Sequence, residues 1–393
     1  MTQLPPLPLI NGALLVDNSM LELLTTCPRQ LEYNKLHKRI SANESPSLTF
    51  GSAIHLGMEL RYKTCGNLPT DPVYDSNISS LLEKFFLAHP VPVEDYRNFN
   101  WALQVLHRYN AKYQQEEFDL LEYEEPLDCN QCAGVGAVQT LNETGEKQDE
   151  PCVFCDGSGK NKIMVELPFT VDLFWWEGLL PLSILPHDFP KEQILNSSET
   201  QAQVRVRVVY CGRIDLPHLI GEDLFVMDHK TTSLLGAGFY EQMRMSAQQK
   251  GYCWSLQKLL QRKVRGYQVN TIRIKEPPKY VTEGKVSRSG KSATVESWWD
   301  ESLQRERYYL NEGEIEEWHQ NTIELINEFF WHYQQGVFPK KTTWCVAKYG
   351  KCSYYDVCSL FPIESRGMML HSGNYMENKW TPLLAPSQSK QQG

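Results

Sequence analysis

Two carboxylates and a lysine stand at the ends of two neighbouring apolar runs. One run ends in Gly-Arg-Ile-Asp215, and the next continues into Asp228-His229-Lys230. Two adjacent strands would bring both carboxylates to one sheet edge, and strand alternation places Asp228 and Lys230 on the same face. Carboxylate oxygens suit a hard divalent cation that activates water, and a lysine orients that water or stabilises developing negative charge. This combination fits metal-assisted phosphodiester hydrolysis.

Two further motifs flank this group in the chain. Asp-x-Lys alone is usually a surface pair, and a lone histidine is more often a satisfied core residue than a ligand. Here, Gly51-Ser-Ala-Ile-His55 precedes the pair on an expected helix, and Gln248-Gln-Lys-Gly-Tyr252 follows it on another. Gln248 and Tyr252 are four residues apart and project from one helical face. The ordered series favours a single site.

In this order the motifs resemble the RecB-type branch of the PD-(D/E)xK nucleases, over roughly residues 19–359. The resemblance implies Lys230 as the catalytic lysine, with Asp215 and Asp228 in the active site. It also implies an Mg or Mn site whose ligands are His55, Asp215, Asp228 and the backbone carbonyl of His229. It implies a supporting or DNA-contacting role for Gln248, Tyr252 and the upstream acid Glu166.

The chain has eleven cysteines, which are better explained by metal sites than by disulfides in a chain without a secretory signal. Two C-x2-C-x-G-x-G knuckles supply Cys129 with Cys132 and Cys152 with Cys155. Paired, four thiolates make one tetrahedral zinc site. The knuckles resemble the zinc module of DnaJ-type chaperones over about thirty residues. Two roles remain open for this insertion, a purely stabilising one and one in contacting DNA or a partner.

A second set consists of Cys27 near the start of the chain and Cys345, Cys352 and Cys358 near its end. This set resembles the four-cysteine arrangement of iron–sulfur members of the same branch, including CRISPR-associated adaptation exonucleases and AddB-type nuclease domains. The resemblance implies a structural [4Fe–4S] cluster, for which four thiolates are suitable ligands. Zinc bound by the same four thiolates remains the alternative.

The net charge of −9 argues against a simple polyanion binder, yet residues 259–291 are rich in Lys and Arg. A basic run is often only a solvated face. Because this one follows the catalytic motif, it predicts a nucleic-acid-facing surface. The candidate residues are Arg262, Lys263, Arg265, Lys285, Arg288 and Lys291.

The expected fold is α/β, a PD-(D/E)xK restriction-endonuclease-like core with a central mixed sheet flanked by helices. A helical N-terminal region and a small zinc-binding insertion complete it. Strands are predicted at Ile163–Leu173, Val204–Asp215, Leu224–His229 and Tyr267–Ile274. Helices are predicted from a cap at Ser19, after Gly51, within Ser80–Tyr123, over Phe239–Leu260 and over Glu314–Gln335, with a loop at Ser183–Gln201. Pro28 should interrupt the first helix.

Five segments follow from these motifs: 1–127 as the helical N-terminal part, 128–160 as the zinc insertion, 161–340 as the nuclease core, 341–376 as the iron–sulfur segment and 377–393 as a disordered tail. The most apolar stretch, residues 167–185, contains Asp172 and Glu177, so a membrane span is not expected. With no secretory signal at the N-terminus, a cytoplasmic location is expected.

The predicted activity is that of a metal-dependent DNA nuclease. An exonuclease acting on DNA ends or single strands is favoured, in recombination, repair or phage DNA processing. The chain has no G-x4-GK[ST] P-loop, so any unwinding would need a separate helicase or recombination protein. The alternative is a non-catalytic nucleic-acid-binding or scaffold protein that retains the nuclease fold.

Overall fold

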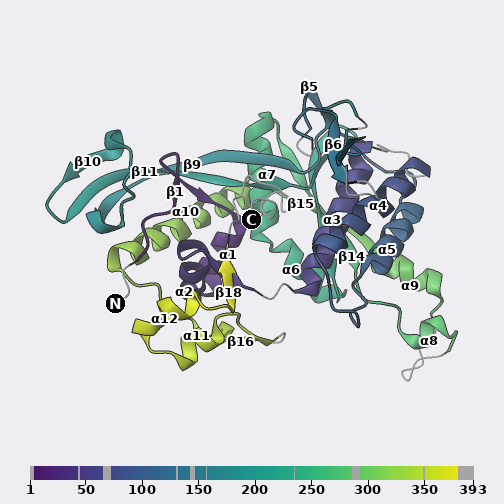
Figure 1. Cartoon of the computed structure of the whole chain (residues 1–393). Helices are drawn as coiled ribbons and strands as arrows, with labels where there is room; N and C mark the ends of the chain where they lie inside the picture. The colour runs from purple at the N-terminus through teal and green to yellow at the C-terminus, as the bar shows by residue number, and fades with distance from the viewer. Residues whose placement is uncertain are drawn as a thin grey trace. The chain divides into compact units, whose positions relative to one another are not determined.

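The computed structural model shown in Figure 1 describes most of the chain. The described residues are 4–42, 45–64, 72–129, 132–141, 147–155, 157–233, 235–285, 293–347 and 350–378. Arg288, Lys291 and the tail from residue 379 lie outside them. None of the helices in the described part of the chain combines the length and apolar character needed to cross a membrane.

The chain folds as two compact units that each combine segments distant in the sequence. Unit 1 consists of Met1–Glu44, Pro168–Arg213 and Glu312–Gly393. Unit 2 consists of Ser45–Leu167 and Ile214–Asn311. The candidate cysteine cluster belongs to unit 1, whereas the knuckles and every candidate active-site residue belong to unit 2.

The main sheet of unit 1 is built around one long strand. Its order is β1 (Leu9–Ile10), β2 (Ala13–Val16), β11 (Gln201–Ile214) and β10 (Ile194–Ser197), and β9 (Leu167–Pro181) also pairs with β11. Alternate residues of the first part of β11 are buried, as a half-buried strand requires. The expected loop over Ser183–Gln201 therefore contains a strand, because β10 forms an antiparallel ladder with β11.

The first helix of unit 1, α1 (Asn18–Thr26), begins at a different cap from the predicted one. Asp17, not Ser19, is the N-cap, and its carboxylate accepts a hydrogen bond from the Met20 N–H at 2.9 Å. Aspartate satisfies this otherwise unpaired amide as well as serine does. The predicted interruption is confirmed, because α2 (Pro28–Leu31) starts at the proline. The long helix α10 (Glu312–Gln335) packs against α1.

Short elements complete unit 1. They are the π-helix Glu32–Leu36, β3 (Arg39–Ser41), the 3-10 turns Leu182–Ile184, Lys191–Gln193 and Thr342–Trp344, β16 (Val346–Ala347), β17 (Gly350–Lys351), α11 (Tyr355–Leu360), α12 (Ile363–Leu370) and β18 (Tyr375–Glu377). β18 pairs with β3, and its Glu377 lies opposite Arg39. The ordered chain thus continues past the predicted start of the tail.

A five-stranded mixed sheet forms the centre of unit 2. Its order is β15 (Leu303–Tyr309), β14 (Val264–Arg273), β13 (Asp223–Thr232), β12 (Leu216–Ile220) and β4 (Asp119–Leu120). β13 and β14 are parallel, and the other neighbours are antiparallel. A parallel pair needs a crossover connection, which the helices between the two strands supply. The predicted mixed α/β fold is confirmed.

Helices flank this sheet. On one side, α3 (Pro46–Thr64), α4 (Pro72–Ala88) and α5 (Phe99–Lys112) lie against one another, as Figure 1 shows. Their core includes buried sheet residues such as Met227 and Ile272. The unit also contains α8 (Lys279–Thr282) and α9 (Val295–Ser302).

The single helix predicted over Phe239–Leu260 is two helices, α6 (Ala237–Arg244) and α7 (Ala247–Leu260). Ser246 between them is extended, with ψ of 118°. The Tyr267 hydroxyl donates to the carbonyls of Met243 and Arg244 at 2.9 and 3.1 Å. A side chain thereby satisfies carbonyl groups at the end of α6, where the helix cannot.

The knuckle insertion is a small β structure within unit 2, and its cysteines share the buried core of α3, α4 and α5. Its outer pair is β5 (Glu122–Asp128) with β8 (Lys160–Ile163), and its inner pair is β6 (Ala137–Leu141) with β7 (Lys147–Pro151). The strand predicted over Ile163–Leu173 is divided, because β8 ends at Ile163 and β9 begins at Leu167. Glu166 lies in the intervening bend.

Candidate active site and metal centres

The hairpin of β12 and β13 brings the two aspartates together. Leu216 pairs with Met227, so the same register places Asp215, which precedes β12, beside Asp228. Both carboxylates are buried, and the backbone N–H of His229 donates to Asp215 Oδ2 at 2.7 Å. The structure thus brings together the two aspartates that the sequence predicts at one sheet edge.

Helix α3 carries His55 to this edge. Gly51 lies one turn earlier, and a Cβ at Gly51 would stand 3.1 Å from the Thr231 hydroxyl oxygen of β13. The glycine therefore permits the close approach of helix to strand. His55 Nδ1 lies 3.5 Å from Asp215 Oδ2 and 3.8 Å from Glu166 Oε1.

Glu166 completes a candidate metal group. Donor atoms of His55, Glu166 and Asp215 all lie within 4.8 Å of one another. Glu166 has φ of +51°, a left-handed conformation that is uncommon for non-glycine residues, and its N–H donates to the Asp215 carbonyl at 2.8 Å. This backbone bond holds the carboxylate beside Asp215. The sequence gives Glu166 no ligand role, because nothing in the residue pattern signals a left-handed bend.

Lys230 lies in a chain of polar contacts on the same sheet edge. Its Nζ is 2.8 Å from Asp228 Oδ2 and donates to Gln248 Oε1 at 2.8 Å. Gln248 Nε2 in turn donates to the Tyr252 hydroxyl at 2.9 Å. The predicted Gln248 and Tyr252 face of α7 therefore contacts the lysine, which retains 28% exposure of its side chain. That exposure leaves the ammonium within reach of a substrate.

Several carboxylates lie close together in this buried site. Burial, with added repulsion from Asp228 and Glu166, raises the pKa of Asp215 to about 7. Burial lowers the pKa of His55, but the attraction of Asp215 and Glu166 outweighs it and raises that pKa to about 9. Buried carboxylates with one imidazole form a suitable donor set for a divalent cation, which would relieve this repulsion.

The ring of His229 points away from Asp228, to the other face of β13, and is held there. Its Nδ1 lies 2.7 Å from Asn270 Nδ2 on β14, and its ring stacks on Tyr62 at 5.9 Å with an interplanar angle of 7°. Burial lowers the pKa of His229 well below its usual value, so the ring is neutral. The fixed ring holds the backbone whose N–H donates to Asp215.

Behind His229 is a buried ion cluster that sequence reasoning missed. Glu116 accepts bonds from the guanidinium groups of Arg61, at 2.7 Å, and Arg305. Arg305 also donates to the Tyr109 hydroxyl at 2.6 Å, and Tyr109 accepts from Asn270 at 2.9 Å. Removing one partner from such a cluster leaves a buried charge uncompensated. These residues lie far apart in the sequence, at no motif spacing.

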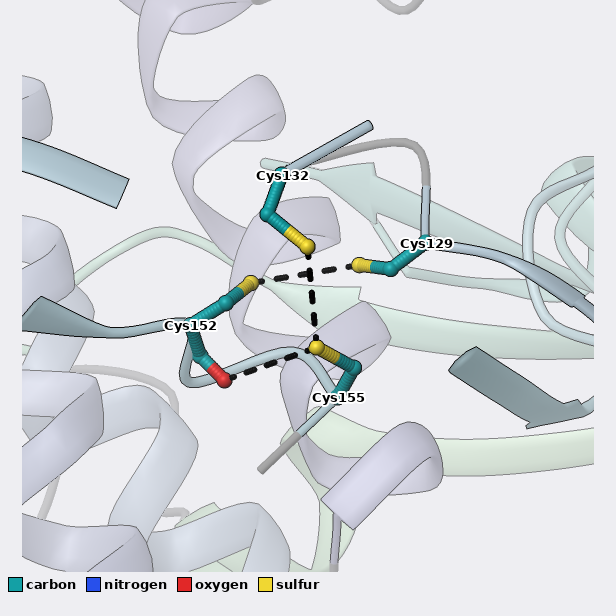
Figure 2. A group of neighbouring side chains, drawn as sticks. All are labelled: Cys129, Cys132, Cys152 and Cys155. Atoms are coloured by element: carbon teal, nitrogen blue, oxygen red, sulfur yellow. Dashed lines mark hydrogen bonds between the residues drawn. The ribbon is translucent and has the colours of Figure 1, made fainter. Parts of the chain in front are cut away.

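The predicted knuckles come together as one four-cysteine site. Figure 2 shows the sulfurs of Cys129, Cys132, Cys152 and Cys155 directed toward one another. The sulfur atoms of Cys129 and Cys152 lie 3.9 Å apart, and those of Cys132 and Cys155 lie 3.7 Å apart. Zn–S bonds of about 2.3 Å in a tetrahedron place sulfurs about 3.8 Å apart, so the residues fit zinc.

Glycines shape both knuckles. The N–H of Gly136 donates to Cys132 Sγ at 3.2 Å, and that of Gly159 donates to Cys155 Sγ at 3.3 Å. Both glycines have positive φ, of 82° and 73°. A Cβ at Gly136 would stand 2.3 Å from the Gly157 carbonyl oxygen, and one at Gly159 would stand 2.2 Å from that of Gly134. Each knuckle therefore depends on glycine in the other.

The four cysteines of the second set line one cavity in unit 1. Cys27, Cys345, Cys352 and Cys358 share it with Tyr33 and Tyr354. Cys27 and the three C-terminal cysteines thus line the same cavity, and their role as cluster ligands stays a prediction. Among the described residues, the cysteines whose sulfurs all approach within 4.8 Å are those of the knuckles, and this second set is more widely spaced.

The basic candidates are not gathered at the active site. Arg262, Lys263 and Arg265 lie at the start of β14, whereas Lys230 pairs with Thr271 near its other end. Seven residues from the start of the strand correspond to about 23 Å. Lys285 follows α8 and pairs with Glu283 at 2.6 Å. The nucleic-acid role of these residues stays a prediction, and Arg288 and Lys291 lie outside the described residues.

In the comparison with protein families, the model described as the PD-(D/E)XK nuclease superfamily matches residues 18–359. This range begins with α1 and ends one residue after Cys358, so it contains the whole site around Asp215 and both cysteine sets. Comparison with curated proteins finds no match.

Proposed function

Because this chain belongs to the PD-(D/E)XK nuclease superfamily, we propose that unit 2 hydrolyses DNA phosphodiester bonds at the site around Asp215 and Lys230. One observation carries the proposal. His55, Glu166 and Asp215 converge within 4.8 Å at the sheet edge where Lys230 contacts Asp228. A scaffold that only binds nucleic acid would have no need of a buried, mutually repelling acid pair beside a positioned lysine.

His55, Glu166 and Asp215 would hold Mg²⁺ or Mn²⁺, with Asp228 and the His229 carbonyl as further ligands. Oxygen-rich donor sets suit both ions, and an imidazole ligand is better suited to Mn²⁺ than to Mg²⁺. When bound, the ion neutralises charge on the scissile phosphate and makes its water more acidic. The His55 side chain is partly exposed, with 33% of its surface accessible, which leaves the group open to ions and substrate.

Lys230 would act on the water or on the phosphate oxygens. Its ammonium is fixed by Asp228 on one side and by the Gln248 amide oxygen on the other. Because Tyr252 accepts a hydrogen bond from Gln248, the amide orientation is fixed as well. A positioned cation that needs no reorganisation in the transition state is the arrangement that stabilises developing negative charge most effectively.

We further propose an exonuclease that acts on DNA ends or single strands, in recombination, repair or phage DNA processing. Support comes from the four-cysteine arrangement, which resembles that of end-processing members of the family. The described part of the chain offers no element with the form of a sequence-reading module. A separate helicase or recombination protein would supply any unwinding.

The cysteine sites would stabilise the two units. Zinc at Cys129, Cys132, Cys152 and Cys155 would join the two knuckles, because each supplies two of its four thiolates. For the cavity with Cys27, the wider sulfur spacing supports a [4Fe–4S] cluster over a single zinc ion. Such a cluster would connect the two ends of unit 1.

The test is a cleavage assay with labelled single-stranded and double-stranded DNA, with Mn²⁺, with Mg²⁺ and with chelator. The wild-type protein should cleave DNA in the presence of either metal ion and should not cleave it in the presence of chelator. Lys230→Ala should lower the cleavage rate by at least about a hundredfold, because it removes charge stabilisation in the transition state. Lys258→Ala, at an exposed position of α7, is the matched control and should cut like wild type. No cleavage by wild type would contradict the nuclease proposal.

A further inference from the structure

A cavity of about 590 Å³ opens in unit 2 just beyond the candidate active site. Ser233 in its lining follows Lys230 by three residues on the same chain segment. Arg273, also in the lining, pairs with Thr232 and ends β14. Two residues along a strand span about 7 Å, so the cavity begins roughly one nucleotide's length from the lysine.

Arg273 is directed to the same side of the sheet as the lysine. In the parallel ladder, Lys230 pairs with Thr271 and Thr232 pairs with Arg273, so all four residues share one face. The buried Arg273 Nε has no hydrogen-bond partner among the described residues. Its guanidinium carbon lies 5.9 Å from the ring centre of Trp298.

Trp298 in the cavity lining is buried and packed among other tryptophans. Trp298 packs edge-on against Trp299 at 4.9 Å, and Trp299 lies 5.4 Å from Trp101. The Trp101 indole N–H donates to the Ile274 carbonyl at 2.7 Å, just after the end of β14. Tyr280 lines the cavity as well and is partly exposed. Because Trp298 is buried, Tyr280 is the aromatic ring of the lining that is open to stacking on a planar ligand.

The charged lining is balanced. Arg273 and Lys275 supply two cations, and Glu276 and Glu301 supply two carboxylates. A site for phosphate alone would not contain two carboxylates, and a site for an apolar ligand would not contain four charges. A nucleobase has a π face together with acceptor and donor groups on its edge. Guanidinium groups recognise base acceptors, and carboxylates accept from base amino groups.

We propose that this cavity receives one unpaired nucleobase of the DNA strand that is cut. Tyr280 stacks on the base, and Arg273 with the carboxylates contacts its edge. The proposal rests on the nuclease function above, and it assigns a single-stranded substrate, because a base in a duplex is stacked and paired. A duplex end would have to open by at least one base pair, at a cost that a single strand avoids.

The test combines abasic substitution with variants of the cavity. Single-stranded oligonucleotides that lack one base at successive positions are bound to Lys230→Ala protein in Mg²⁺, and affinity is measured by fluorescence anisotropy. One position near the cleavage point should weaken binding by about tenfold, since stacking of one base contributes about 1–3 kcal/mol. In Tyr280→Ala, the oligonucleotides that keep the base at this position should bind about tenfold more weakly, and removing that base should have no further effect.

Two further variants separate stacking from loss of structure. Tyr280→Phe keeps the ring, so removing the base at the sensitive position should still weaken binding. Arg273→Ala should make this loss of affinity smaller. Lys258→Ala lies on α7 and outside the cavity lining, so it should leave the effect of the abasic position unchanged. If wild type cuts DNA but no single position shows an abasic effect that Tyr280→Ala removes, the cavity proposal is overturned and the nuclease proposal stands. If a position shows the effect and wild type does not cut, the cavity proposal stands and the nuclease proposal fails.

Discussion

Lowering the pH from about 8 to about 6 should weaken Mn²⁺ binding at the His55 group by about a thousandfold. A cation binds the neutral imidazole and the ionised carboxylates, so protons compete with it wherever the pH lies below the pKa of a ligand. Attraction of Asp215 and Glu166, which outweighs burial, raises the pKa of His55 to about 9. Burial, with Asp228 and Glu166, raises the pKa of Asp215 to about 7.

The two groups titrate in different parts of this pH range. His55 is protonated throughout, so each pH unit of acidification costs about tenfold in affinity, or about a hundredfold over two units. Asp215 competes only below its pKa of about 7 and contributes about another tenfold. Binding of Mn²⁺ should accordingly release about two protons from His55 and Asp215 at pH 6, and about one proton at pH 8.

Isothermal titration calorimetry with Mn²⁺, in paired buffers of different ionisation enthalpy, measures both the affinity and the number of protons released. His55→Ala protein is the control that reports Mn²⁺ binding at other sites. An affinity that is the same at both pH values, or release of less than about half a proton at each, would refute the reasoning. The metal would then not bind through a protonated His55 and a buried Asp215.

Three substitutions test other parts of the structure. Gln248→Ala should slow cleavage by about ten- to a hundredfold, because a hydrogen bond to the charged Lys230 contributes about 1.5–3 kcal/mol, and unchanged single-turnover rates would contradict its role. Gly136→Ala should reduce bound zinc and the melting temperature, since its Cβ would meet a carbonyl oxygen at 2.3 Å, whereas Gly238→Ala, whose Cβ meets nothing within 4 Å, should change neither. Cys352→Ala should lose iron and acid-labile sulfide in anaerobic preparations, and zinc instead of iron in wild type would exclude the cluster.

Local rules of the sequence were sufficient to predict which residues meet at the candidate active site. Strand alternation places Asp228 and Lys230 on one face, and the short connection after Asp215 predicts the hairpin that sets the two aspartates side by side. Four-residue spacing on α7 predicts that Gln248 and Tyr252 share a face. These relations depend on residues close in the chain, which is why periodicity predicts them.

What the sequence could not predict depends on tertiary contacts or unusual backbone conformations. Glu166 owes its place among the candidate ligands to a left-handed bend and to one backbone hydrogen bond to Asp215. Glu116 meets Arg61 and Arg305 from three distant segments. The break between α6 and α7 reflects a tyrosine hydroxyl on β14, which helical periodicity cannot register.

Because the two units are built from interleaved segments, their residues are completed in a fixed order during synthesis on the ribosome. Unit 2 is complete in sequence once Asn311 has been synthesised, so its sheet can form while the rest of the chain is still to come. Cys27 is made early but lines its cavity with residues that follow more than three hundred positions later. At synthesis rates of about 5–20 residues per second, about 16 to 64 seconds pass between the synthesis of Cys27 and that of Cys345. During that interval the thiol would depend on the reducing power of the cell. A premature stop before Cys345 would leave unit 2 complete but the cysteine cavity without its C-terminal residues.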